Sequence, residues 1–233
     1  MALKVIVSYD DTDNDRDALA LGRLFLGLGA EVALAYVRHT QESDEARERL
    51  EEHEAEELLE RGARSLGDGA QRHVVLSGST GEGLWALAER EGADIVVFGS
   101  DYRTAPGKVR LGTSAQRLLE GGPAAIAVAP SNLRDRDELT VARVGVIPEE
   151  ADETTEASAH ALAASLGATV AESLDEPVDM LVVGSRPEAP RGRVMLSAAA
   201  EYAIEDAASP VLVVPRSVIL PFAAPAPAPP VHA

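Results

Sequence analysis

Short apolar runs without polar alternation recur along the first part of the chain. A strand that is covered on both faces has this pattern, because none of its side chains meets water. Runs of this kind, or short segments rich in β-branched residues, span 4–9, 31–37, 73–76, 95–98 and 124–129. The pattern therefore predicts five strands within residues 3–130.

Segments with helical spacing separate these strands. The first carries apolar residues at Ala18, Leu21, Leu24, Phe25 and Leu28. Such residues lie on one face of a helix, and Gly29 after them is a residue type that commonly ends one. Further helices are predicted over 43–66, which is very acidic, over 84–91, and from Gly112 to Pro123. Alternating strands and helices predict an α/β fold with a doubly wound parallel sheet.

The carboxyl ends of two predicted strands carry candidate ligand-binding residues. Asp10 follows the first strand, and Gly99-Ser100 follows the fourth. In doubly wound sheets, ligands bind at this edge, near the point where the strand order reverses. Asp10 is also the first of five aspartates between positions 10 and 17, a cluster that equally suits a turn and the N-cap of the next helix.

The loop after the fourth strand predicts an anion site. It leads to Gly112-Thr113-Ser114 at the start of a helix, where backbone N–H groups lack intrahelical partners and two hydroxyls stand beside them. Three cations of the loop are candidates to face a phosphate: Arg103, Lys108 and Arg110. A plain helix cap and a solvated loop are the alternative interpretations.

The same loop resembles the nucleotide loop of the universal stress protein family, which has the pattern Gly-x2-Gly-x9-Gly-Ser/Thr. Here Gly99, Gly112 and Thr113 match in register, and Tyr102 stands at the second glycine. The whole segment 3–130 is similar to one domain of that family, which usually begins with an apolar strand that ends in Asp. The resemblance implies a Rossmann-like, three-layer fold with the strand order 3-2-1-4-5.

An adenine nucleotide, ATP or AMP, is the ligand that this resemblance implies, with Mg²⁺ accompanying ATP. In nucleotide-binding members the Asp at this position contacts the ribose, so Asp10 takes that role here. The end of the second strand, about Val37, would offer backbone groups to adenine. The other residues implied at the site belong to the loop: Gly99, Ser100, Arg103, Gly112, Thr113 and Ser114.

Two further classes of function stay open beside a nucleotide-binding stress or regulatory protein. The first is a scaffold of the same fold that binds no nucleotide and acts through contacts with an unknown protein partner; Tyr102 motivates it. The second is an enzyme of the related pyrophosphatase-type synthetase folds. Those enzymes carry a Ser-Gly-Gly-x-Asp-Ser loop after the first strand, whereas SYDDTDND, without glycine, stands here.

The sequence predicts no catalytic residue and no metal site. No side chain stands out as a general base and no G-x-S-x-G elbow is present, so weak hydrolysis of ATP is the most that is expected. The five histidines show no spacing typical of metal ligands.

A second, shorter copy of the domain is predicted over residues 141–216. Leu28-Gly29-Ala30 matches Leu166-Gly167-Ala168 at an offset of 138 residues. Gly99-Ser100 matches Gly184-Ser185 at an offset of 85, so the copy lacks the long acidic helix, the third strand and the third helix. Its segment 173–178 is barely long enough to carry the chain back past one strand. Strand 169–172 is therefore expected to be displaced or to run differently.

The second copy has lost the candidate site. The replacements are Pro148 for Asp10, Ser197 for Gly112 and Ala198 for Thr113. A loop without the close-approach glycine and the hydroxyl should bind phosphate poorly. The nucleotide is therefore expected only in the first domain, residues 1–134.

The fifth strands of the two copies are expected to pair with each other. Universal stress proteins commonly dimerise through these strands, so the resemblance implies that 124–129 and 211–214 form an intramolecular pseudo-dimer. Both strands are apolar, and pairing would bury two edges that otherwise invite association. A further homodimer stays open. Residues 217–233 form a tail: 217–222 could pack as an arm, and the Pro/Ala-rich end from 223 should be extended, mobile and partly disordered.

Composition excludes several classes of protein. The chain has 39 acidic and 21 basic residues, and its net charge of −18 would repel nucleic acid. It has no cysteine, so it can form neither a disulfide framework nor a thiolate metal site. No run approaches the roughly 18 apolar residues of a membrane span, and MALKVIVSYD lacks a signal-peptide pattern. No membrane partner is expected, and the cytoplasm is the expected location.

Overall fold

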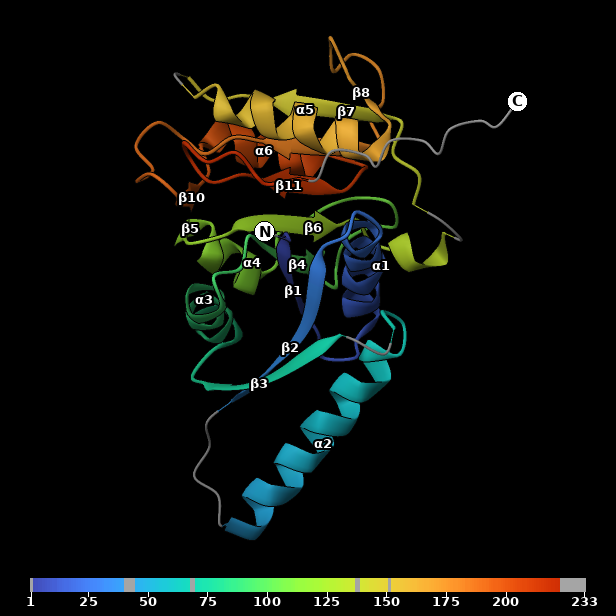
Figure 1. Ribbon diagram of the computed structural model, residues 1–233, viewed down its shortest axis with the longest axis vertical. Helices are drawn as coiled ribbons and strands as arrows, with labels where there is room; N and C mark the ends of the chain where they lie inside the picture. Colours follow the sequence, from blue (N-terminus) through green and yellow to red (C-terminus); the bar gives the residue numbers. More distant parts are fainter. Residues whose placement is uncertain (1, 40–44, 68–69, 137–138, 151, 223–233) are drawn as a thin grey trace, which may run out of the picture.

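The computed structural model describes residues 2–39, 45–67, 70–136, 139–150 and 152–222 of the chain. At its centre, the described residues form one sheet of nine strands in the order β3-β2-β1-β4-β6-β11-β9-β7-β8 (Figure 1). The strands are β1 (Lys4–Ser8), β2 (Glu31–His39), β3 (Gln71–Ser77), β4 (Ile95–Gly99), β6 (Ala125–Ala129), β7 (Arg143–Ile147), β8 (Thr169–Val170), β9 (Met180–Val183) and β11 (Val211–Val213). Neighbouring strands run parallel except β6 and β11.

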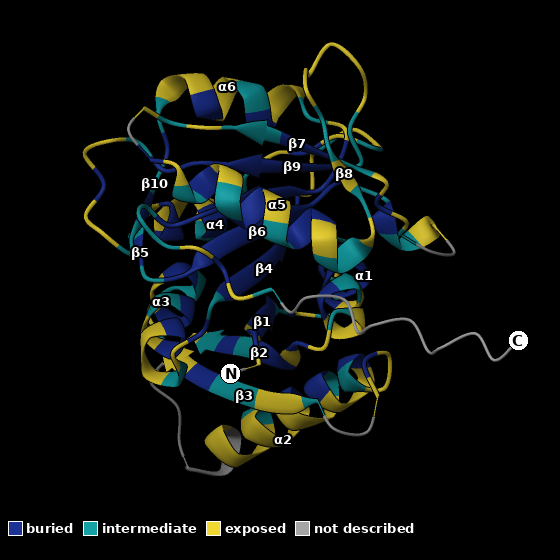
Figure 2. Cartoon of the chain, turned by 45° about the horizontal axis from the view of Figure 1, so that its top comes forward, coloured by how far each residue is buried: buried dark blue, intermediate teal, exposed yellow. Residues whose placement is uncertain are grey.

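Helices cover both faces of this sheet, so the molecule has three layers. On one face lie α1 (Asp13–Gly27), α2 (Glu45–Ala63) and α5 (Thr154–Leu166). On the other lie α3 (Thr80–Glu91), α4 (Thr113–Leu118) and α6 (Ala198–Asp206). Buried positions follow the strands through the middle of the molecule (Figure 2). The α/β class and the doubly wound sheet are confirmed.

The acidic helix α2 projects from the body of the molecule (Figure 1). Only a narrow stripe of its described side chains is buried, including Ala55 and Leu59. Its mean hydropathy is low because eight of its 19 residues are glutamates. None of the helices in the described ranges is long and apolar enough to cross a bilayer.

Strands β6 and β11 join the first half of the chain to the second at the middle of the sheet. They pair antiparallel, with Val128 opposite Val211 and Ile126 opposite Val213. All four of these side chains are fully buried, so the pairing closes two apolar edges at once. The segments 124–129 and 211–214, expected to pair, are neighbours in the sheet.

The helix predicted from Gly112 to Pro123 is wrong in its last residues. Helix α4 ends at Leu118, and residues 120–122 form a short strand, β5 (Glu120–Gly122). Its partner is β10 (Val194–Met195) from the second half, and the two make a small antiparallel sheet. This arrangement requires glycine at position 122, because a β-carbon there would lie 2.4 Å from the backbone oxygen of Leu118.

The expected displacement of strand 169–172 did not occur. The strand is reduced to the two residues of β8, which pair in parallel with Arg143 and Val144 of β7. Because β8 is this short, enough residues remain to carry the chain from β8 past β7 to β9. The return crosses close over β7 at Gly145, where a β-carbon would lie 2.7 Å from a methyl carbon of Leu174 and 3.0 Å from one of Val178. Glycine at this position makes the close crossing feasible.

Two short segments pack against the helices of the first face. The 3₁₀ turn η1 (Leu133–Asp135) lies against α1 and leads into the second half. Near the end of the chain, Leu220 is buried, and its backbone N–H donates to the Ser158 hydroxyl of α5 at 3.1 Å. The ring of Phe222 then stacks on Phe25 of α1 at 6.5 Å between centroids. The expected mobile end, 223–233, lies outside the described residues.

The two halves share hydrogen bonds at positions 85 residues apart. The Ser100 hydroxyl donates to the Ala129 oxygen at 2.7 Å, and the Ser185 hydroxyl donates to the Val214 oxygen at the same distance. Asn132 and Ser217, also 85 residues apart, both adopt the left-handed backbone conformation, with φ of 66° and 56°. The correspondence therefore extends from the sequence to backbone geometry.

Candidate functional site

A cavity of about 450 Å³ opens at the carboxyl ends of β1, β2 and β4. Of the eight residues predicted for the site, it brings together seven: Asp10, Val37, Gly99, Ser100, Gly112, Thr113 and Ser114. Arg103 is not among its lining residues. The remaining lining residues come mainly from the same strand ends and from the first turn of α1. This is the edge at which doubly wound sheets bind ligands.

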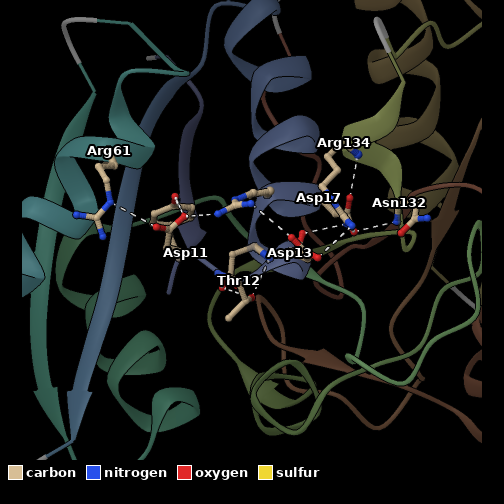
Figure 3. A network of polar contacts seen from close by, with 10 residues as sticks. Asp11, Thr12, Asp13, Asp17, Arg61, Asn132 and Arg134 are labelled. Atoms are coloured by element: carbon tan, nitrogen blue, oxygen red, sulfur yellow. Dashed lines mark hydrogen bonds and ion pairs between the residues drawn. The ribbon is translucent and has the colours of Figure 1, made fainter.

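Asp11 has partners that tie it to two helices (Figure 3). Its carboxylate accepts a hydrogen bond from the Tyr9 hydroxyl at 2.8 Å and forms ion pairs with Arg16 at 3.1 Å and Arg61 at 3.4 Å. The Tyr9 hydrogen bond contributes most to lowering the pKa of Asp11, with Arg16 adding to it. Burial, strengthened by the Asp11 contact, raises the pKa of Tyr9 to about 12. Asp11 is held in a left-handed conformation, with φ of 55°.

Two other aspartates of the cluster, Asp13 and Asp15, lie in the first turn of α1. Asp15 forms a capping box with Thr12, because the two side chains each accept from the other's backbone N–H. Burial raises the pKa of Asp15 despite these hydrogen bonds. Asp13 is exposed and pairs with Arg16 at 3.5 Å and Arg134 at 3.4 Å. The interpretation of the cluster as turn and cap therefore holds for most of it.

Asp17 is buried and anchors the segment that leads to the second half (Figure 3). Its carboxylate accepts from the backbone N–H groups of Asn132 at 2.9 Å and Arg134 at 2.8 Å. The guanidinium of Arg134 adds an ion pair at 3.0 Å. Three donors thus satisfy this buried carboxylate, as a charge at such a position requires.

Asp10 differs from the other four aspartates. Within the described ranges no hydrogen bond or ion pair reaches its carboxylate, although its backbone N–H donates to Asp15 at 3.1 Å. Partial burial raises the pKa of Asp10, and the positive charge that His39 can carry opposes this shift. The carboxylate lines the cavity and has acceptor capacity to offer a ligand.

Gly99 and Ser100 position the loop. A β-carbon at Gly99 would lie 2.0 Å from the backbone oxygen of Asn14, so only glycine lets α1 approach β4 this closely. The Ser100 hydroxyl, besides donating to Ala129, accepts from the Arg110 backbone N–H at 3.3 Å. Both residues line the cavity, but the contacts described above join them to other parts of the protein.

The cations of the loop point to different places. The Arg103 guanidinium lies over the ring of Tyr102 at 4.9 Å, and that ring is 71% exposed. Lys108 donates to the backbone oxygen of Asp206 in α6 at 2.9 Å. Arg110 lines a different cavity, between the halves of the chain. None of the three faces the cavity beside Asp10.

The segment Gly112-Thr113-Ser114 has space in front of it. A β-carbon at Gly112 would meet nothing within 4 Å, and Gly112 provides no side-chain cap to α4. Within the part of the chain that the structure describes, no hydrogen bond engages the Thr113 or Ser114 hydroxyl. Donors in this open corner are available to a ligand.

Sequence reasoning missed several lining residues. Tyr36 and His39 lie at the end of β2, and Thr80 begins α3. Tyr36 and His39 could have been predicted, because residues at the end of β2 lie at the same edge of the sheet as the end of its neighbour β1. No local pattern marks Thr80. The described residues also contain no group of three His, Asp or Glu side chains able to hold a metal.

In the second half, the corresponding corner is filled by the chain itself. The Ser197 hydroxyl accepts from the Ala200 N–H at 3.2 Å and donates to the Glu149 carboxylate. Helix α6 thus begins with its own side-chain cap and a neighbouring carboxylate. An anion approaching there would meet negative charge.

Comparisons with known proteins were made on sequence and on structure. A family model described as "Universal stress protein family" matches residues 1–130. A universal stress protein from Archaeoglobus fulgidus DSM 4304 superposes with a TM-score of 0.70 at 15% identity, over 92% of this chain and 98% of that one. A functionally unknown protein from Pseudomonas aeruginosa PAO1 gives 0.62 at 14% identity, over 94% of each chain. No curated protein matches the sequence. At these identities the structural matches show a shared fold.

Proposed function

The chain belongs to the universal stress protein family, and from this premise we propose that the cavity beside Asp10 binds an adenine nucleotide, ATP or AMP, in a stress-response or regulatory role. One observation carries the proposal: Asp10 is the aspartate of its cluster whose carboxylate the described protein leaves without a partner, and it lies in the cavity. Such a carboxylate accepts hydrogen bonds from the two hydroxyls of a ribose.

The remaining lining residues suit the other parts of a nucleotide. Adenine fits against the end of β2, where Val37 and Tyr36 line the cavity. The phosphates would extend toward Gly112-Thr113-Ser114, where the hydroxyls can donate and no β-carbon obstructs the approach. With ATP, Mg²⁺ would be carried on the phosphates, as is usual for this ion. Gly99 and Ser100 contribute by holding the loop in place.

The proposed role is binding, with hydrolysis at most slow. The histidine that lines the cavity, His39, is the last residue of β2 and lies on the adenine side, away from the corner proposed for phosphate. A fast hydrolase needs a base within hydrogen-bonding reach of the attacking water. The bound nucleotide would then act as a signal carried by the protein.

The test is calorimetric titration of the full chain with ATP, ADP and AMP. Asp10→Asn keeps the size of the side chain but removes its charge, and we expect it to weaken binding about tenfold or more, since charge-assisted hydrogen bonds are lost. Asp13→Asn is the matched control: Asp13 belongs to the same cluster, pairs with arginines and does not line the cavity. Equal losses in both variants would contradict the assignment of Asp10.

A second candidate function is a scaffold that binds no nucleotide and acts through protein contacts. The observation that favours it is Tyr102, which stands where the family has a glycine, lines the cavity and carries Arg103 on its exposed ring. Absence of binding of all three nucleotides at millimolar concentration would favour this candidate. Nucleotide released from the purified protein on denaturation would exclude it.

We further propose that residues 141–216 are a shortened second copy of the domain in 1–134. The support is the set of hydrogen bonds and left-handed residues that recur 85 positions apart, together with the antiparallel pairing of β6 and β11. In this copy Glu149 and Ser197 fill the corner that is open at Gly112. The nucleotide site is therefore proposed for the first copy alone.

A further inference from the structure

A second cavity lies between the two halves of the chain, beside the small sheet of β5 and β10. Its volume is about 570 Å³, compared with about 450 Å³ for the cavity beside Asp10, and both fall in the usual range of small-molecule sites. It is lined by the residues that precede α4, by α4 and β5, and from the second half by the loop after β9, by β10 and by α6. All of its lining residues lie within the described ranges.

The lining includes apolar side chains from both halves. Leu119 and Leu196 are buried, with 5% and 7% of their surfaces exposed, while Leu111 and Met195 are partly buried. Leu111 and Leu196 are 85 residues apart, so matching positions of the two halves meet here. Apolar surface of this kind favours the aliphatic part of a ligand.

Unpaired charges of both signs surround the apolar lining. In the described ranges, no hydrogen bond or ion pair engages the guanidinium of Arg110 or the carboxylates of Glu201 and Glu205. The two glutamates lie one turn apart on α6, so they repel each other when both are ionised. A cation placed between them would relieve that repulsion, and an anion beside Arg110 would pair that charge.

Arg186 adds a second guanidinium to the cavity, and it is poorly satisfied. Its Nε is buried without a hydrogen bond in the described protein and forms a long ion pair with the Glu188 carboxylate at 4.0 Å, while its Nη2 donates to the sulfur of Met195 at 3.9 Å. The third glutamate of the lining, Glu120, is already paired with Arg117 at 3.0 Å. The charges of the lining that lack a partner among the described residues are therefore the Arg110 guanidinium and the carboxylates of Glu201 and Glu205, and Arg186 adds a guanidinium that only Glu188 pairs, at 4.0 Å.

We propose that this cavity is a second ligand site, for a zwitterionic amino compound with an apolar body, namely an amino acid or a short peptide. Its carboxylate accepts hydrogen bonds from Arg110 and Arg186, and its ammonium group donates to Glu201 and Glu205. Its aliphatic side chains lie against Leu111, Leu119 and Leu196. A polyphosphate is disfavoured, because the two glutamates repel it.

The loop gives this site a connection to the cavity beside Asp10. Arg110 and Leu111 line the cavity between the halves, and the next residues, Gly112 and Thr113, line the other one. The experiment below measures ligand binding to the cavity between the halves in the absence of nucleotide. Its outcome is therefore separate from that of the nucleotide proposal.

The experiment is titration of the full chain, without nucleotide, with leucyl-leucine, octanoate and octylamine. Leucyl-leucine carries both charges on an aliphatic body, and the other two probes carry one charge each. We expect leucyl-leucine to bind at least about tenfold more tightly than either single-charge probe. Arg110→Gln and Glu205→Gln should each weaken leucyl-leucine binding by a similar factor.

Arg103→Gln is the matched control, since this arginine belongs to the same loop and lines neither cavity. It should leave leucyl-leucine binding unchanged, and circular dichroism should show that every variant is folded. No binding of leucyl-leucine at millimolar concentration overturns the proposal. Octanoate binding as tightly as leucyl-leucine also overturns it, because the glutamates would then play no part.

Discussion

At the scale of single residues, two glycines of one loop are subject to opposite constraints. Gly99 is enclosed, because a β-carbon there would meet the backbone oxygen of Asn14 at 2.0 Å. Gly112 is open, with nothing within 4 Å of the same added atom. Neither has a positive φ, so the difference is one of space alone. The first glycine serves packing of α1 on β4, and the second leaves room for a ligand.

We predict that Gly99→Ala destabilises the protein by about 3 kcal/mol or more, because backbone atoms of α1 and β4 must move apart. Gly112→Ala should change the free energy of unfolding by no more than about 0.5 kcal/mol. Urea unfolding followed by circular dichroism measures both. Similar losses in the two variants would show that the loop tolerates no side chain at either position.

A second prediction concerns Asp10 and pH. Its pKa is raised by partial burial, so its carboxylate takes up a proton at a higher pH than an exposed aspartate would. Adenosine, which has no titrating phosphate, should bind more weakly as the pH falls through this raised pKa. Asp10→Asn should bind weakly at every pH tested. A wild-type affinity that does not vary between neutral and acidic pH would rule out a charged contact with the ribose.

The same raised pKa fixes the sign of the effect on stability. Because the folded pKa exceeds the unfolded one, ionised Asp10 costs stability above the folded pKa, and that cost is absent below the unfolded pKa. At neutral pH, Asp10→Asn should therefore have an equal or slightly higher urea midpoint than the wild type. A clear drop in the midpoint would indicate a structural role for this carboxylate.

At the scale of elements, the sequence was most informative where an element depends on its own residues. The central strands β1, β4 and β6, whose apolar side chains are buried, follow from continuous apolar runs. Strands β5 and β10 have no such signal, since each exists because the other supplies its partner across the two halves. The short β8 depends likewise on the segment after it, which crosses over β7 at Gly145. No local sequence pattern predicts that crossing.

The candidate site shows the same division. Positions at strand ends could be predicted, because parallel strands share a carboxyl edge. Asp10 could be singled out in this way, but the engagement of Asp11, Asp13 and Asp17 could not, because it depends on arginines far along the chain. Arg61 engages Asp11, and Arg134 engages Asp13 and Asp17. Arg103, Lys108 and Arg110 are predicted near phosphate from sequence proximity alone, which does not fix where a long side chain points.

The contact between α1 and η1 gives a prediction at this scale. Asp17→Ala removes a buried carboxylate and leaves Arg134 and two backbone N–H groups without their acceptor. We expect a loss of about 3 kcal/mol in the free energy of unfolding. Asp13→Ala, whose side chain is 66% exposed, should cost about 1 kcal/mol or less. Equal costs would mean that Asp17 does not anchor η1.

At the scale of the whole molecule, the antiparallel pair β6–β11 holds the sheet together. The resemblance of the first half to its family led to the expectation of this pairing, and the structure contains it. This pairing leads to a prediction about a shortened chain. A chain that ends at Arg134 would expose the whole edge of β6, whose residues are fully buried in the complete molecule.

We expect that shortened chain to dimerise or aggregate, as sedimentation velocity over a range of concentrations would show. A shortened chain that stays a stable monomer at all concentrations would contradict the importance of the β6 edge.

The pairing of β6 with β11 inside one chain also has a kinetic and evolutionary consequence. Two separate subunits joined by such strands must meet by diffusion, and their association weakens on dilution. Here the halves are tethered through η1, so their encounter is intramolecular and the folded state does not depend on protein concentration. Two identical subunits also receive every mutation twice, whereas tethered halves mutate one at a time. If the half that ends in β11 is a second copy, as proposed above, it could therefore lose an open corner at Ser197 while the half that contains Asp10 kept its own.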